Sequence, residues 1–209
     1  MKKLVLAGML SFAFISFTKA QTLSPSVGIK GGLNFTNLYT EDVDDNNVLS
    51  SFNAGLYANL PLAPSVSIQP EINFSRKGSE LVYDNAFASG TTKLKLNYLE
   101  IPVLLKLNVT PNFNIHFGPY AAYLLDGKAT NESSNSSFNF EENINNDDLN
   151  KWDYGLSGGI GFDFASTSLG IRYNYGLQTI GKERSFGGNT YTFPDSKNSA
   201  LSLYIGFKL

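Results

Sequence analysis

The 209-residue sequence contains no cysteine and a single histidine, His116. Without cysteine the chain has no disulfide framework, no thiolate metal site and no cysteine nucleophile. One histidine excludes a histidine-rich metal site within one chain. Charged residues make up only 16% of the chain, and the formal net charge is −2. This charge argues against nucleic acid as a partner.

Long apolar runs are missing beyond the first 20 residues. Lys2 and Lys3 precede the apolar residues 4–17, and small residues at positions 18 and 20 suit cleavage after Ala20. This arrangement is typical of a secretory signal peptide, and the apolar part is too short for a transmembrane helix of about 20 residues. We therefore expect residues 1–20 to be a signal peptide and residues 21–209 to form one domain. That domain is either soluble outside the inner membrane or membrane-embedded without helices.

The chain is rich in aromatic residues and glycine, with 16 Phe, 11 Tyr and 19 Gly. Apolar and polar residues alternate along most of it, which is the period of a β-strand. For example, Leu201, Leu203 and Ile205 share one face, while Ser202 and Tyr204 share the other. Each block has about ten residues, the length of a tilted membrane strand. We count eight blocks, at residues 27–35, 52–60, 66–75, 99–108, 112–123, 152–163, 169–176 and 201–209.

The connections between these blocks alternate in length. Short turns at one end and long polar loops at the other, around an even number of strands, are typical of outer membrane barrels. We therefore predict an all-β fold, a transmembrane eight-stranded antiparallel up-and-down β-barrel. The expected tight turns are residues 61–65, 109–112 and 165–168, and the expected loops are residues 37–51, 78–92, 126–150 and 179–198.

A soluble eight-stranded barrel such as a lipocalin is the alternative, and it would keep the apolar faces inside. The composition of the faces decides between the two. One face of each block is nearly pure Leu, Ile, Val, Phe and Tyr, while the other carries charges, Gly, Ser and Asn. Eight apolar faces exposed to water would far exceed the apolar patch that a soluble monomer tolerates. We therefore expect lipid outside the barrel.

Nine charged residues point into the barrel if the alternation is followed. Eight strands enclose an interior only wide enough for side chains, and buried charges must be paired. We therefore predict an internal network of ion pairs and hydrogen bonds that fills the barrel. A proton or small-ion path is the alternative. The residues are Lys30, Glu71, Lys77, Glu100, Lys106, Asp153, Asp163, Arg172 and Lys208.

Three further motifs do not match the catalytic or binding sites that they resemble. His116 is expected to point inward, and no Ser-His-Asp arrangement can be placed around it. The glycines of residues 155–161 lie on an alternating strand, not between a strand and a helix, so they do not form a dinucleotide site. The acidic stretch 41–47 begins like a calcium loop, but Asn47 and Asn53 stand where that loop needs Gly and Glu. We predict no catalytic residue, cofactor or metal site.

Two features predict irregular strands. Pro70, Pro102 and Pro119 each remove a backbone donor within a predicted strand, so we expect β-bulges near them. The apolar residues also move from even positions over residues 94–98 to odd positions over residues 99–107. This shift predicts a bulge near residues 98–100 or a segment that extends above the lipid.

Several phrases resemble the PorT-like outer-membrane β-barrel family of Bacteroidota. They are SIQPEINFSRKG at 67–78, NYLEIPVLLK at 97–106, GPYAAYLL at 118–125, GLSGGIGF at 155–162 and LGIRYNYG at 169–176. The phrases QPE and YLEIP are the more specific ones. The resemblance covers almost all of the mature chain and implies an eight-stranded outer membrane barrel without a catalytic motif. The family's namesake takes part in type IX secretion.

We therefore expect a non-enzymatic barrel in the outer membrane of a Gram-negative bacterium, with the N-terminus in the periplasm and the long loops outside. Its role would be structural or a surface interaction. The alternatives are a component of a secretion or envelope assembly of the type IX kind, a narrow porin and a lipid-modifying enzyme. The expected partners are outer-membrane lipid and the barrel-assembly machinery, which would recognise the alternating terminal strand 201–209.

Overall fold

The computed structural model describes residues 24–39, 48–84, 89–133, 139–144, 149–186, 189–192 and 196–209. The regular structure in these ranges consists of β-strands. No helix among the described residues is long and apolar enough to cross a membrane. The predicted signal peptide and the acidic stretch 41–47 lie outside the described residues.

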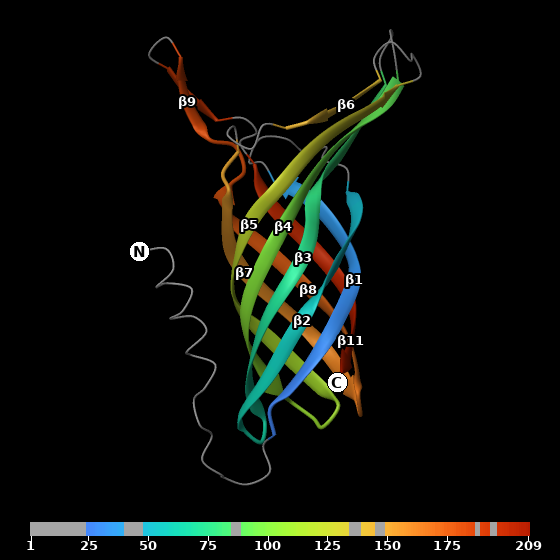
Figure 1. Ribbon diagram of the computed structural model, residues 1–209, viewed down its shortest axis with the longest axis vertical. Coiled ribbons are helices and arrows are strands. Elements are labelled where there is room, and N and C mark those ends of the chain that lie inside the picture. The colour runs from blue at the N-terminus through green and yellow to red at the C-terminus, as the bar shows by residue number, and fades with distance from the viewer. Residues whose placement is uncertain are drawn as a thin grey trace.

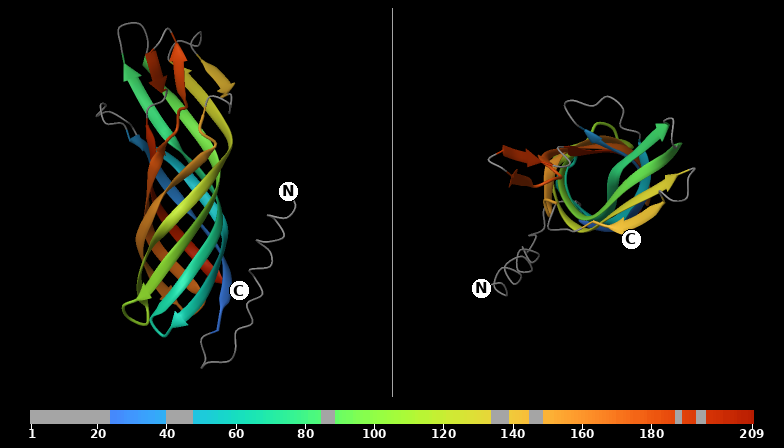
Figure 2. Two further views of the ribbon diagram at one scale, coloured as in Figure 1. Left: turned by 90° about the vertical axis from the view of Figure 1, so that its left-hand side faces the viewer. Right: turned by 90° about the horizontal axis from the view of Figure 1, so that it is seen from above.

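Eight of the strands form a closed ring, seen from above in Figure 2. Every strand pairs antiparallel with its neighbours, and β11 closes the ring against β1, from Gly28 opposite Lys208 to Tyr39 opposite Lys197. The predicted fold is therefore confirmed, and each predicted block lies on its own strand. The ring strands are β1 (Ser26–Tyr39), β2 (Leu49–Ala63), β3 (Val66–Asp84), β4 (Ser89–Asn108), β5 (Phe113–Ser133), β7 (Trp152–Phe164), β8 (Thr167–Thr179) and β11 (Lys197–Lys208).

The two ends of the barrel differ (Figure 1). At one end, which we call the short-turn end, tight turns join β2 to β3, β4 to β5 and β7 to β8. The chain also ends there, where the Leu209 N–H donates to the Val27 carbonyl at 2.9 Å. The other end, the long-hairpin end, carries three short strands. These are β6 (Phe140–Asn143), which pairs with β5, and the hairpin of β9 (Glu183–Phe186) with β10 (Asn189–Thr192).

Three neighbouring strands extend beyond the barrel at the long-hairpin end. β3, β4 and β5 have 19, 20 and 21 residues, while the other ring strands have 12 to 15. Their pairing continues to Asp84 opposite Ser89 and to Gly90 opposite Ser133. The prediction of a loop at 78–92 was therefore wrong for residues 78–84 and 89–92, as was that of a loop at 126–150 for residues 126–133. Backbone pairing needs no apolar side chain, so these polar segments lack the alternation that reveals a lipid-facing strand.

We call residues 79–84, 89–95, 128–133 and 140–143 the protruding sheet. β3 leaves its partner β2 after Ser75, and Gly78 lies just beyond this point with a φ of 146°. A Cβ atom at Gly78 would clash with the Leu94 carbonyl, so only glycine suits this bend. Two hydroxyls satisfy the freed carbonyls of β3. Ser51 donates to Arg76 O at 2.7 Å and Thr36 donates to Gly78 O at 3.0 Å.

The barrel surface is inverted relative to that of a water-soluble protein. Apolar side chains are exposed, including Leu33 (59%), Leu56 (58%) and Trp152 (61%), while inward neighbours such as Asn34 (1%) are buried. Aromatic pairs lie near both margins of this apolar surface. Tyr123–Trp152 lies toward the long-hairpin end and Phe113–Phe162 toward the short-turn end. Two aromatic margins around an apolar band are typical of a barrel surrounded by lipid.

The prolines do not cause the expected bulges. The pairing is interrupted beside Pro70, Pro102 and Pro119, but it resumes in the same register on both sides of each gap. A register shift does lie between Asn97 and Tyr98 of β4, and its extra residue is Leu125 of β5. The predicted bulge near residues 98–100 is thus correct in place, although the partner strand carries the extra residue.

The even-numbered apolar residues of β4 do not change faces. Leu96 and Tyr98 are buried inside the barrel, on the same face as Glu100. The inner face therefore becomes apolar toward the long-hairpin end, which the shift from even to odd apolar positions did not predict. Alternation alone cannot separate an inner face that becomes apolar from a strand that changes sides.

Candidate functional site

The barrel interior is the most elaborate polar site of the molecule, and Glu71 of β3 lies near its middle. Arg172 of β8 donates two hydrogen bonds to the Glu71 carboxylate, at 2.8 and 2.9 Å. Lys30 of β1 donates a third at 2.9 Å. Gln69 and Asn73 donate from the same face of β3, at 2.8 and 2.9 Å. This Glu71 cluster combines two cations with one carboxylate.

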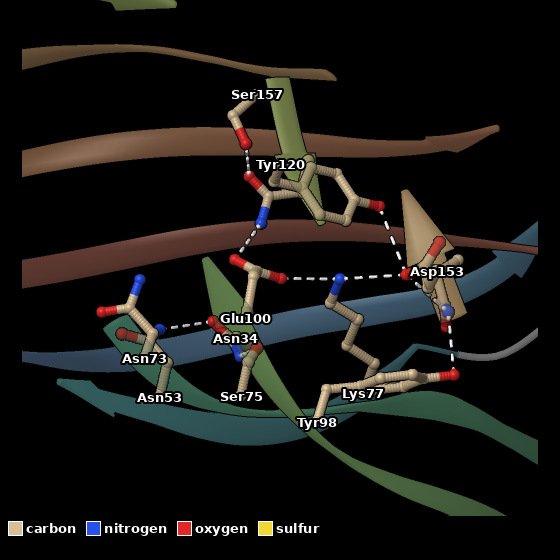
Figure 3. A network of polar contacts seen from close by, with 12 residues as sticks. Asn34, Asn53, Asn73, Ser75, Lys77, Tyr98, Glu100, Tyr120, Asp153 and Ser157 are labelled. Carbon is tan, nitrogen blue, oxygen red and sulfur yellow. Dashed lines mark hydrogen bonds and ion pairs between the residues drawn. The ribbon is translucent and has the colours of Figure 1, made fainter. Parts of the chain in front are cut away.

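Lys77 is the centre of a second cluster, nearer the long-hairpin end (Figure 3). Its Nζ lies 2.7 Å from Glu100 and 3.3 Å from Asp153. The ammonium also lies 4.3 Å from the ring centroid of Tyr120 and 5.4 Å from that of Tyr98. This Lys77 cluster combines one cation with two carboxylates, so its charge is opposite to that of the Glu71 cluster.

Neutral side chains complete the Lys77 cluster. Asn174 donates to Glu100 at 3.0 Å and accepts from Ser157 at 2.8 Å. Asn198 donates to Asp153 at 3.0 Å, and the Tyr120 hydroxyl donates to the same oxygen at 3.3 Å. Sequence reasoning did not assign these asparagines. The available signal was the repeated asparagine at inward positions, including Asn34, Asn53, Asn73, Asn114, Asn174 and Asn198.

A third cluster lies at the short-turn end. Lys106 of β4 pairs with Asp163 of β7 at 2.8 Å. Asn114 and Ser168 donate to the two oxygens of Asp163, at 2.8 and 2.7 Å. His116 lies nearby, and its Nδ1 is 3.0 Å from the Asn114 amide oxygen. The Asn114 amide oxygen could orient the imidazole as in a Cys-His-Asn relay, but the described contacts of His116 contain no serine nucleophile.

The structure corrects the prediction for Lys208. The alternation assigns it to the inner face, but it is the last residue of β11 and its side chain is exposed at the short-turn end. Alternation gives the side of the strand and not the depth in the barrel, so it cannot reveal that a terminal residue leaves the interior. The eight other predicted charges line the interior and all take part in ion pairs, with four cations matching four carboxylates.

An apolar cap closes the interior at the long-hairpin end. Leu149 and Ile180 reach it from segments between the ring strands, and an antiparallel bridge joins Leu149 to Gly181. Sequence reasoning treated both segments as solvated loops and missed these residues, which are isolated apolar positions beside polar stretches. The buried members are Leu38, Leu96, Tyr98, Tyr120, Ala122, Leu124, Leu149 and Ile180.

Two small cavities lie among the clusters. One interior cavity has a volume of about 10 Å³, and its lining residues include Lys30, Glu100 and Arg172. Another, beside His116 and Asp163, has the same size. Each is room for about one water. Among the described residues no group of three or more histidine or acidic side chains could hold a metal ion. The side chains of the three clusters thus occupy the barrel interior.

Solved structures share this architecture. The attachment invasion locus protein Ail of Yersinia pestis, in complex with the heparin analogue sucrose octasulfate, is 12% identical at a TM-score of 0.51. The Neisserial surface protein A, NspA, is 10% identical at a TM-score of 0.50. Each comparison covers 89% of this chain and 99% of the other. At these identities the likeness shows the fold alone.

None of the curated proteins matches the sequence significantly. A family model does match, over residues 19–181, and its description is outer membrane protein beta-barrel domain. The match includes the strands that carry the Glu71 cluster and, apart from Asn198 of β11, those that carry the Lys77 cluster. With the closed ring, the inverted surface and the filled interior, the match establishes that this chain belongs to the outer membrane protein beta-barrel domain family and lies in the outer membrane.

Proposed function

We propose that this protein is a non-enzymatic barrel that holds a rigid sheet outside the cell, where the sheet contacts another molecule. In this proposal residues 1–20 are a signal peptide, the short-turn end faces the periplasm and the protruding sheet faces outward. The barrel interior has a structural role. Lipid surrounds the barrel, and the assembly machinery inserts it through its terminal strand β11.

The length of β3, β4 and β5 carries this proposal. About ten residues suffice for a tilted strand to cross a membrane, so roughly half of each of these strands is not needed for the crossing. The extra length is paired backbone with a defined shape. A tight turn at the barrel rim would close the ring equally well, so the extension supports a task beyond barrel closure.

The surface of the protruding sheet supports the same conclusion. Leu81 (46%), Val82 (55%) and Phe140 (49%) are exposed there, beyond the lipid-facing band. Leu81 and Val82 are neighbours on β3, so apolar side chains are exposed on both faces of the sheet, where a partner could contact them. The sheet is paired up to its last strand, since β6 pairs with β5 and Lys128 of β5 forms an ion pair with Glu141 of β6. The hydrogen bond from Lys128 also lowers the pKa of Glu141.

A role in a secretion assembly of the type IX kind is the second candidate. The resemblance of residues 67–78 and 97–106 to the PorT-like family of Bacteroidota supports it, and both segments lie in β3 and β4. The narrow porin has less support because the interior cavities hold about one water each. The lipid-modifying enzyme has less support because the described contacts of His116, with Asn114 and Tyr204, include no serine nucleophile.

Complementation with a shortened hairpin tests the surface role. Residues 81–92 are replaced by an Asn-Gly turn, which retains Glu80 opposite Lys93 and suits a two-residue hairpin. A deletion strain then receives the full-length or the shortened gene. We expect both proteins to reach the outer membrane at equal levels, with heat-modifiable gel mobility. Only the full-length protein should correct the defect that the gene deletion causes.

The matched control keeps the hairpin length and removes its apolar side chains, through Leu81→Ser with Val82→Ser. A surface contact predicts loss of rescue in this variant as well. Full rescue by the shortened barrel would contradict the proposal and show that the barrel alone performs the function. Co-purification of a stoichiometric envelope complex with both variants would favour the secretion assembly.

A further inference from the structure

The lipid-facing surface carries a hollow over β7, β8, β11 and β1. The hollow, which we call the Gly31 groove, has a volume of about 500 Å³. Its walls are exposed apolar side chains, among them Leu33 of β1, Ile171 of β8 and Leu203 of β11. Gly31 lies opposite Ile205 and has no side chain to fill the space between the walls.

The groove extends toward the short-turn end. Phe162 lies opposite Leu169, two residues before the end of β7, and both line the groove. Lys208 is exposed at the same end of the barrel, three residues beyond the lining residue Ile205 on β11. Among the described residues, no carboxylate lies within ion-pair distance of Lys208. An exposed cation thus lies three residues beyond the groove along β11, at the rim of the barrel.

The concave shape of the Gly31 groove favours a lipid chain over a second barrel as the bound molecule. In a two-fold pair of barrels the same patch meets itself, so groove would face groove and leave a void. A stable protein interface also needs close packing over about 1,600 Å². A flexible hydrocarbon chain fills a narrow apolar groove without these requirements, and the volume lies in the range of small-molecule sites.

We propose that the Gly31 groove binds one acyl chain of a phospholipid and that Lys208 pairs with its phosphate. The site holds this lipid longer than the lipids elsewhere around the barrel. The groove walls contact the acyl chain on both sides, and the many weak dispersion contacts sum to a larger interaction energy. The site is independent of the protruding sheet, so it can fail or hold without affecting the proposed surface role.

Filling the groove tests the proposal. A Cβ atom at Gly31 would meet only the Asn53 carbonyl, at 3.6 Å, which is ordinary contact. Gly31→Leu therefore places a side chain in the groove without a backbone clash. Gly158→Leu is the matched control, because a Cβ atom at Gly158 has nothing within 4 Å and this residue does not line the groove. Both changes add the same side chain.

The full mature chain, refolded in detergent micelles, is titrated with phosphatidylglycerol, and native mass spectrometry counts the bound lipids. We expect one retained lipid in the wild type and in Gly158→Leu, and about tenfold weaker retention in Gly31→Leu because chain packing is lost. Lys208→Gln should weaken retention about fivefold through the lost phosphate contact. Gly31→Ala should give an intermediate loss, and heat-modifiable mobility reports folding of every variant.

Three results would overturn the proposal. The wild type could retain no lipid, Gly31→Leu could retain it as the wild type does, or both leucine variants could lose it equally. A fourth result would also overturn it. If the wild type forms dimers in the mass spectra and Gly31→Leu forms only monomers, the groove binds a second copy of the chain and not a lipid.

Discussion

At the residue scale, the Glu71 carboxylate holds two buried cations, Arg172 and Lys30. The change Glu71→Gln keeps the shape and removes the charge, so both cations lose their ionic partner inside the barrel. Breaking a buried pair in this way costs about 3–5 kcal/mol. We therefore expect the free energy of unfolding, measured by urea denaturation in lipid-free detergent micelles, to fall by about that amount.

Lys208→Gln is the control for this change, since Lys208 is exposed and lies outside the clusters. Exposed substitutions of this kind change the free energy of unfolding by no more than about 0.5 kcal/mol. Equal losses in Glu71→Gln and Lys208→Gln would show that the buried pairs do not stabilise the fold.

The exposed apolar side chains lead to a second prediction, on depth in the membrane. Leu203 lies within the lipid-facing band, while Leu209 is the terminal residue at the short-turn end and is 76% exposed. An arginine costs about 2–4 kcal/mol at the membrane midplane and about 0–1 kcal/mol near its surface. Leu203→Arg should therefore lower the free energy of unfolding in lipid vesicles more than Leu209→Arg. Equal losses of unfolding free energy in the two variants would show that Leu203 does not lie deeper in the membrane than Leu209.

At the element scale, alternation predicted the ring strands because a lipid outside and a polar interior force a period of two on every strand. The same signal failed where one of these two environments is missing. Residues 79–84 and 89–92 are paired but carry no apolar face, so they resembled a loop. Leu96 and Tyr98 face an apolar interior, so they resembled a change of side. The contacts of Leu149 and Ile180 depend on how distant segments fold over the barrel, which no local pattern records.

The terminal strand gives the element-scale prediction. β11 pairs with β1 on one side and with β8 on the other. Deleting residues 197–208 leaves both neighbours with open edges in lipid, where each unpaired backbone group costs several kcal/mol. We expect the deletion to abolish insertion, measured as the protein level in isolated outer membranes. The shortened β3–β4 hairpin, which opens no edge in lipid, is the control and should insert normally.

At the scale of the whole molecule, the interior is closed by three polar clusters and an apolar cap in series. Cavities of about 10 Å³ between them cannot form a continuous water column. We expect no channel openings above the leak of a protein-free bilayer when the refolded protein is recorded in planar bilayers. Stable openings would contradict the filled interior and favour the narrow porin.

The orientation of the whole barrel can be tested cleanly because the chain contains no cysteine. Val82→Cys places a thiol on the protruding sheet, and Pro111→Cys places one in the turn between β4 and β5 at the short-turn end. Both side chains are exposed. A membrane-impermeant maleimide should label Val82→Cys on intact cells and Pro111→Cys only after the outer membrane is permeabilised. The reverse pattern would point the protruding sheet into the periplasm. The barrel fold would stand, but the extension of β3, β4 and β5 would then serve a periplasmic partner.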